Sequence, residues 1–183
     1  MKQRGFTMSL WDRHPLAVNY QTVKDLGYQG TLEDLISVFH GCHDLVYETS
    51  PITPGIVELI DYLHERGFKL GVVSASANDW IETVLNKLKR RDSFNCLVSL
   101  NKHPVLKTKP APDGYLHAME TLGVTPDQTV ILEDSQAGVT AAKQSGALTI
   151  CFTGLHPNDY LVEGADVYLQ SIALVRDFIQ SKI

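Results

Sequence analysis

The stretch TVILEDSQAGVTAAKQSGALTICF, residues 129–152, determines the fold of this chain. Its two apolar runs, 129–132 and 148–152, have the length of buried strands, and a helix is predicted between them over 136–145, ending at Gly146. A strand, a helix and a second strand in this order form a crossover unit whose strands run parallel. The stretch therefore predicts an α/β fold.

The same alternation continues on both sides of this unit. Upstream, a helix is predicted to begin with Thr53 as its cap and to end at Gly67, with apolar residues recurring at helical spacing between them. Further strands are predicted over 68–73, 96–100 and 166–169, the last at an edge, and further helices over 81–88, 115–122 and 172–179. Together they predict a Rossmann-like parallel sheet with helices on both faces.

A break in the sequence divides the chain into two predicted domains. Residues 48–55 contain two prolines and a glycine, which is typical of a hinge or linker. Upstream, two helices are predicted over 16–26 and 32–47, with Thr31 able to cap the second. We therefore expect a small helical domain over 1–50 and the α/β domain over 51–183.

Composition excludes several classes of protein. The 183 residues are 44% hydrophobic and 20% charged, as in an ordinary globular protein, and the net charge of −5 argues against nucleic-acid binding. Three scattered cysteines do not form a secreted disulfide framework. No apolar run is long enough to span a membrane, so we expect a cytoplasmic protein.

Three predicted strands are followed by polar residues, at the edge where parallel sheets bind ligands. Ser74 and Ala75 follow the first strand, where a hydroxyl and backbone N–H groups at a helix start can cradle phosphate. Lys109 precedes a helix opened by proline, where its ammonium can act on phosphate oxygens. Glu133 and Asp134 follow the third strand and could hold Mg²⁺. Each feature also has a plain alternative: a helix cap, a solvated surface lysine and a capping acidic pair.

Taken together and in this order, the three motifs resemble those of the haloacid dehalogenase superfamily of Mg²⁺-dependent phosphohydrolases. The resemblance covers about residues 51–183 and is strongest to the β-phosphoglucomutase-like branch, which includes sugar-phosphate phosphatases. It implies that Ser74 and the Ala75 amide bind the transferring phosphoryl group and that Lys109 neutralises this group and orients the nucleophile. It also implies that Asp134, with Glu133 beside it, holds Mg²⁺ directly or through water. Residues 1–50 resemble part of the helical cap of these enzymes.

One motif of this superfamily is absent from the sequence. The superfamily carries Asp-x-Asp at the end of its central strand, where the first aspartate attacks phosphorus, and no two aspartates stand two apart in this chain. A weak substitute is the apolar run over 6–11 that is followed by Asp12, with His14 at the acid–base position. The preferred interpretation is an N-terminally incomplete chain that binds phosphate without attacking it.

The absent motif also has a structural consequence. By the resemblance, its strand belongs between the strands that end at Ser74 and Glu133. Burial of about five apolar side chains at about 1.5–3 kcal/mol each is comparable with the stability of a whole domain. We therefore expect a marginal fold unless those two strands close on each other or something else fills the place, and open strand edges favour self-association.

Three functional hypotheses stay open from the sequence. The first is a phosphohydrolase acting on a small phosphorylated metabolite such as a sugar phosphate, with this chain inactive as it stands. The second is a non-catalytic phosphate-binding or interaction protein, and the third is a truncated gene product.

A short cluster at His40, Cys42 and His43 is interpreted as structural, because no second pair of metal ligands lies nearby in the sequence.

Overall fold

The computed structural model describes residues 24–25, 27–35, 37–38, 49–101, 103–155 and 161–182. The contacts of the chain divide it into two units, Met1–Pro51 and Ile52–Ile183. In the first unit, the Asp34 N–H donates to Thr31 Oγ1 over 3.1 Å, and the Thr31 N–H donates to Asp34 Oδ2 over 2.8 Å. Thr31 therefore caps the helical residues that follow it, as predicted. The assignment of residues 1–50 as a cap stays a prediction.

The described residues of the second unit form five parallel strands in two sheets. β1 pairs with β2 in one sheet, and β3, β4 and β5 form the other in that order. The strands are β1 (Leu70–Ser74), β2 (Phe94–Ser99), β3 (Val130–Glu133), β4 (Leu148–Phe152) and β5 (Val167–Leu169). The parallel α/β fold expected from the sequence is confirmed.

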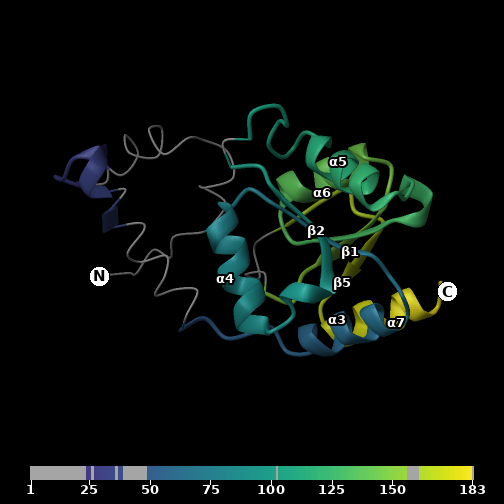
Figure 1. Cartoon of the computed structure of the whole chain (residues 1–183). Helices are drawn as coiled ribbons and strands as arrows, with labels where there is room; N and C mark the ends of the chain where they lie inside the picture. The colour runs from purple at the N-terminus through teal and green to yellow at the C-terminus, as the bar shows by residue number, and fades with distance from the viewer. Residues whose placement is uncertain are drawn as a thin grey trace. The chain divides into compact units, whose positions relative to one another are not determined.

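Helices cover both faces of these strands (Figure 1). The α-helices are α3 (Ile56–Glu65), α4 (Asn78–Leu88), α5 (Asp113–Leu122), α6 (Gln136–Gln144) and α7 (Ile172–Gln180), and the short 3₁₀ helices are η2 (Arg91–Ser93) and η3 (Pro126–Gln128). On one side, α3 and α7 enclose Ile150 and Phe152 of β4. On the other, α5 and α6 bury Ile131 of β3. The elements predicted over 53–179 are present, with ends that shift by a few residues. The helices predicted over 16–26 and 32–47 lie mostly outside the described residues.

The start of α3 differs from the prediction. The helix begins at Ile56, and its N-cap is Gly55 at φ 85°, with no side-chain cap. Thr53 contributes its backbone carbonyl, which accepts from the Ile56 N–H over 3.2 Å. The predicted Thr53 cap is therefore wrong, because a left-handed glycine turn separates Thr53 from the helix.

Among the described residues, no hydrogen-bonded ladder joins the two sheets. β1 and β3 are nevertheless neighbours, since Val73 of β1 and Ile131 of β3 pack against the same cluster beneath α5. The carboxyl ends of these two strands position the candidate site.

Candidate active site

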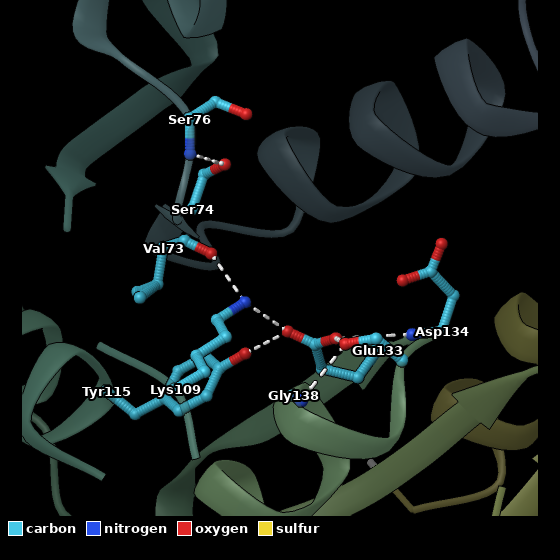
Figure 2. Close-up of polar contacts among 9 residues, drawn as sticks. Val73, Ser74, Ser76, Lys109, Tyr115, Glu133, Asp134 and Gly138 are labelled. Atoms are coloured by element: carbon cyan, nitrogen blue, oxygen red, sulfur yellow. Dashed lines mark hydrogen bonds and ion pairs between the residues drawn. The ribbon is translucent and has the colours of Figure 1, made fainter. Parts of the chain in front are cut away.

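Lys109 connects the carboxyl ends of β1 and β3 (Figure 2). Its Nζ donates to the Val73 carbonyl oxygen over 3.0 Å and to Glu133 Oε1 over 2.5 Å. The lysine and glutamate side chains are only 15% and 8% exposed, so the pair is largely removed from water. A charge buried this deeply requires its partner, and Lys109 is therefore fixed in position by the strand carbonyl and the carboxylate.

Glu133 is held by further donors besides Lys109. The Tyr115 hydroxyl donates to Oε1, and Oε2 lies 3.3 Å from both the Asp134 N–H nitrogen and Ser135 Oγ. Burial and the neighbouring Glu133 charge raise the pKa of Tyr115, so the phenol stays protonated and acts as a donor. Both carboxylate oxygens of Glu133 are thus engaged by the protein itself.

The first turn of α6 packs closely against the Glu133 carboxylate. Ser135 caps the helix by accepting from the Gly138 N–H over 3.0 Å. A Cβ atom on Gly138 would lie 1.9 Å from Glu133 Oε2, far inside any permitted contact. Glycine at this position therefore lets the glutamate lie against the first turn of α6.

Serine hydroxyl groups at the ends of β1 and β2 hold the loop after β1. The Ser76 N–H donates to Ser74 Oγ over 3.0 Å, and Ser99 Oγ at the end of β2 donates to the Ser76 carbonyl over 2.7 Å. The loop leads into α4, which begins at Asn78. Ser74 lies directly after Val73, whose carbonyl binds Lys109, so the loop and the lysine share one edge of the strands (Figure 2).

This geometry can be compared with known proteins. Residues 17–152 match the family described as haloacid dehalogenase-like hydrolase, which is well over half of the chain. The chain belongs to this family.

Two curated relatives are phosphatases by name. The chain is 39% identical over 129 residues to hexitol phosphatase B of Escherichia coli K12, covering 70% of this chain and 57% of that protein. It is 34% identical over 122 residues to validoxylamine A 7'-phosphate phosphatase of Streptomyces hygroscopicus subsp. limoneus, covering 67% of this chain and 56% of that protein. The matched part of this haloacid dehalogenase-like chain thus spans slightly over half the length of these relatives.

Solved structures agree with the family assignment. CbbY from Rhodobacter sphaeroides in complex with phosphate is 27% identical, with a TM-score of 0.67 over 80% of this chain and 66% of that chain. A β-phosphoglucomutase-like protein from Thermotoga maritima has a TM-score of 0.75 at 21% identity, over 97% of this chain and 85% of that chain, which supports the fold alone.

The structure brings together the residues predicted from the strand ends of this haloacid dehalogenase-like chain. Ser74, Lys109 and Glu133 lie at one edge, and Asp134 follows immediately, its carboxylate directed away from Lys109 in Figure 2. The roles assigned to them stay predictions. The substitute pair Asp12 and His14 and the cluster over 40–43 lie outside the described residues.

Two contributing residues were not predicted. The sequence places Tyr115 only on the apolar face of a helix, and nothing in it indicates that its hydroxyl reaches Glu133. Ser99 follows an apolar run that resembles any buried strand. Both contacts depend on tertiary packing between separate strands and helices.

The residues present can be tested against the Mg²⁺ that the family implies. Within the described ranges, no three histidine, cysteine, aspartate or glutamate side chains form a metal-binding group. Glu133 is engaged by protein donors, and the adjacent Asp134 is the carboxylate to which the resemblance assigns a cation. Mg²⁺ in proteins takes one or two carboxylates together with waters and substrate phosphate. The donor set therefore fits Mg²⁺ only with phosphate present.

None of the helices in the described part of the chain has the length and hydropathy needed to cross a bilayer.

Proposed function

We propose that this chain binds a small phosphorylated metabolite, such as a sugar phosphate, at the carboxyl ends of β1 and β3. The observation that carries the proposal is the position of Lys109, held between the Val73 carbonyl and Glu133. The names of the phosphatase relatives support the substrate class. A relative that is 27% identical was solved in complex with xylulose-(1,5)bisphosphate.

The hydrogen-bonding capacity of Lys109 supports an anion at this site. An ammonium group has three N–H donors, and two of them are directed at Val73 and Glu133. The third remains for a phosphate oxygen, and the fixed ammonium would neutralise part of the phosphate charge. Ser74 and the Ala75 amide, in the loop before α4, would bind further phosphate oxygens.

Asp134 is the proposed carboxylate ligand of Mg²⁺, with affinity that depends on bound phosphate. When bound, Mg²⁺ would polarise the phosphoryl group and offset its negative charge. Glu133 would act indirectly by holding Lys109 in place.

Binding of a phosphorylated metabolite does not require that the chain hydrolyse it. Phosphoryl transfer in this family, by the resemblance described above, requires an aspartate nucleophile from an Asp-x-Asp motif, and the 183 residues contain none. We therefore expect binding without turnover, which keeps the non-catalytic phosphate-binding function as the alternative to an enzyme. Measurable Mg²⁺-dependent hydrolysis of an aryl phosphate, abolished by Asp12→Asn, would contradict this expectation.

Binding can be tested by thermal unfolding in the presence of inorganic phosphate. We expect phosphate to raise the melting temperature of the parent protein, because a ligand that binds only the folded state stabilises it. Lys109→Met should remove the phosphate-induced shift, measured against the variant's own baseline. Lys107→Met is the matched control, since Lys107 is exposed two residues away. The proposal would be refuted if phosphate did not raise the melting temperature of the parent protein. It would also be refuted if Lys107→Met removed the phosphate-induced shift to the same extent as Lys109→Met.

A further inference from the structure

The segment between β2 and α5 is held by side-chain acceptors. Nδ1 of His103 accepts from the Val105 N–H over 3.3 Å and from the Leu106 N–H over 3.0 Å. The next backbone donor, the N–H of Lys107, donates to Asp113 Oδ2 over 3.1 Å. Three consecutive N–H groups therefore depend on two titratable side chains.

The two bonds to Nδ1 fix the chemical state of His103. A neutral imidazole has one N–H and one acceptor nitrogen. Because two backbone N–H groups are directed at Nδ1, this nitrogen is the acceptor and the ring proton is on Nε2. Protonation would place a hydrogen on Nδ1, and an imidazolium has two donors and no acceptor. Proton binding and the two backbone bonds therefore exclude each other.

Loss of these bonds would affect the two donor residues differently. The Val105 side chain is 80% exposed and lies at the surface, so water can replace Nδ1 at this residue. Leu106 is half-buried and packs against a buried cluster that β2 and α5 share. A donor that loses its acceptor at a half-buried position destabilises that position. Protonation of His103 should therefore release Leu106 from the cluster.

Other titratable and charged groups lie around His103. On α5, the His117 ring lies 6.4 Å from the His103 ring between centroids, and Asp113 is bound to the Lys107 N–H. Lys107 is exposed in the segment itself, and the neighbouring Lys102 lies outside the described residues. Histidine is the residue type that ordinarily changes charge between pH 5 and 8. A test therefore has to separate the two histidines.

We propose that His103 is a pH-dependent switch that, when protonated, releases residues 103–107 and thereby weakens anion binding by Lys109. Lys109 follows the segment by two residues, so its backbone is less restrained once the segment is released. Ordering that backbone again on binding costs conformational entropy, which lowers the affinity. The effect on anion binding rests on the proposed function, whereas the release of the segment does not.

The sign of the effect distinguishes this switch from simple electrostatics. Acid adds positive charge to a protein, and this charge by itself attracts anions more strongly. Release of the segment acts in the opposite direction, because it disorders the backbone that carries Lys109. Anion binding that weakens as the pH falls is therefore the signature of the switch.

Amide hydrogen exchange on the full chain, measured by NMR at about pH 8 and about pH 5, tests the release of the segment. Protection factors are compared, because they remove the intrinsic effect of pH on exchange. We expect the protection of the Val105 and Leu106 amides to fall about tenfold at the lower pH. The Ser76 amide is the internal control, since its acceptor is the Ser74 hydroxyl and does not titrate in this range.

Substitutions of His103 separate the switch from other effects of pH. In His103→Asn, the side-chain oxygen is as many bonds from Cα as Nδ1, so it can accept the same N–H groups without titrating. We expect this variant to keep Val105 and Leu106 protected at both pH values. His103→Leu has no acceptor and should leave them unprotected at both. If His103→Leu does not fold, the parent and His103→Asn still give the decisive contrast, and His117→Asn should behave as the parent does.

Sulfate is the probe for anion binding, because its charge, unlike that of phosphate, is constant over this pH range. An NMR titration at constant ionic strength follows the amides of Ala75 and Ser76, in the loop proposed to bind phosphate. We expect the parent to bind sulfate about tenfold more weakly at the lower pH. His103→Asn should lose this weakening.

Unchanged protection of Val105 and Leu106 in the parent at the lower pH would overturn the proposal, as would an equal loss of protection in His103→Asn. Release of the segment without weaker sulfate binding would also overturn it, and so would weaker binding that persists in His103→Asn. If sulfate does not bind the parent at the higher pH, the link to Lys109 fails together with the proposed function. The protection of the Val105 amide distinguishes that failure from failure of the switch.

Discussion

Removing both partners of the Lys109–Glu133 pair should destabilise the fold by less than the sum of the two single losses. Lys109→Met leaves the Glu133 carboxylate, 8% exposed, without its cation. Loss of one partner from a buried pair costs about 3–5 kcal/mol. We expect about 3 kcal/mol here, at the lower end of that range, because Tyr115 and Ser135 still contact the carboxylate.

The reverse substitution, Glu133→Gln, should cost about 2 kcal/mol, since the unpaired ammonium is more exposed and keeps its bond to the Val73 carbonyl. The double variant leaves neither charge buried, so it should cost about 2–3 kcal/mol, less than the sum of the single losses. The resulting coupling free energy is about 2–3 kcal/mol.

Urea unfolding followed by circular dichroism measures each free energy of unfolding. The matched control is the pair formed by Arg176 and Asp177, which lie 3.4 Å apart and are 45% and 61% exposed. Exposed pairs contribute about 0–1 kcal/mol, so the Arg176→Met and Asp177→Asn cycle should give no measurable coupling. Additive losses at Lys109 and Glu133, matching the control, would refute the conclusion that this pair is a buried and mutually dependent unit.

Two further substitutions test the surroundings of the pair, and a third tests a separate ion pair, Lys143–Asp166. Gly138→Ala should lower the free energy of unfolding by more than about 2 kcal/mol in the same urea assay, because its Cβ would collide with Glu133; a neutral effect would mean that the glutamate lies elsewhere. Ser135→Ala should cost about 1 kcal/mol through loss of the α6 cap, and an unchanged unfolding midpoint would contradict the capping bond to the Gly138 N–H. Asp166 accepts from Lys143 and from a backbone N–H, and these bonds, that of Lys143 foremost, lower its pKa below the ordinary 3.8. The stabilisation is therefore complete above pH 3.8 and is lost as the pH falls through the lower folded-state pKa, so Asp166→Asn should flatten the acid limb of the stability curve and leave its slope near neutral pH unchanged.

The elements of the fold could be predicted because their signals are local. Glycines end the helices at Gly123 and Gly146, both with positive φ, and short apolar runs between them form the strands. The correction at Thr53 also has a local cause, since a glycine turn lies between the threonine and the helix. Residue spacing alone does not distinguish a helix that is capped by a threonine side chain from one that begins after a glycine turn.

The candidate site was predictable in part. The residue types Ser74, Lys109 and Asp134 follow strands, and parallel strands bring their carboxyl ends to one edge. The partner of Lys109 was not predictable: the sequence offers two adjacent carboxylates, and only packing turns Glu133 toward the lysine. The Tyr115 contact has the same origin, because it joins a helix to a strand 18 residues away.

The sequence by itself determined the order of strands and helices, the family and the residue types at the strand ends, since these follow from short-range periodicity and motif spacing. Only the tertiary structure decided that β1 and β3 lie as neighbours without pairing, with Lys109 between their ends. Strand neighbours are chosen by the hydrogen bonding and burial available across the whole sheet, and neither is a property of any one segment of the chain.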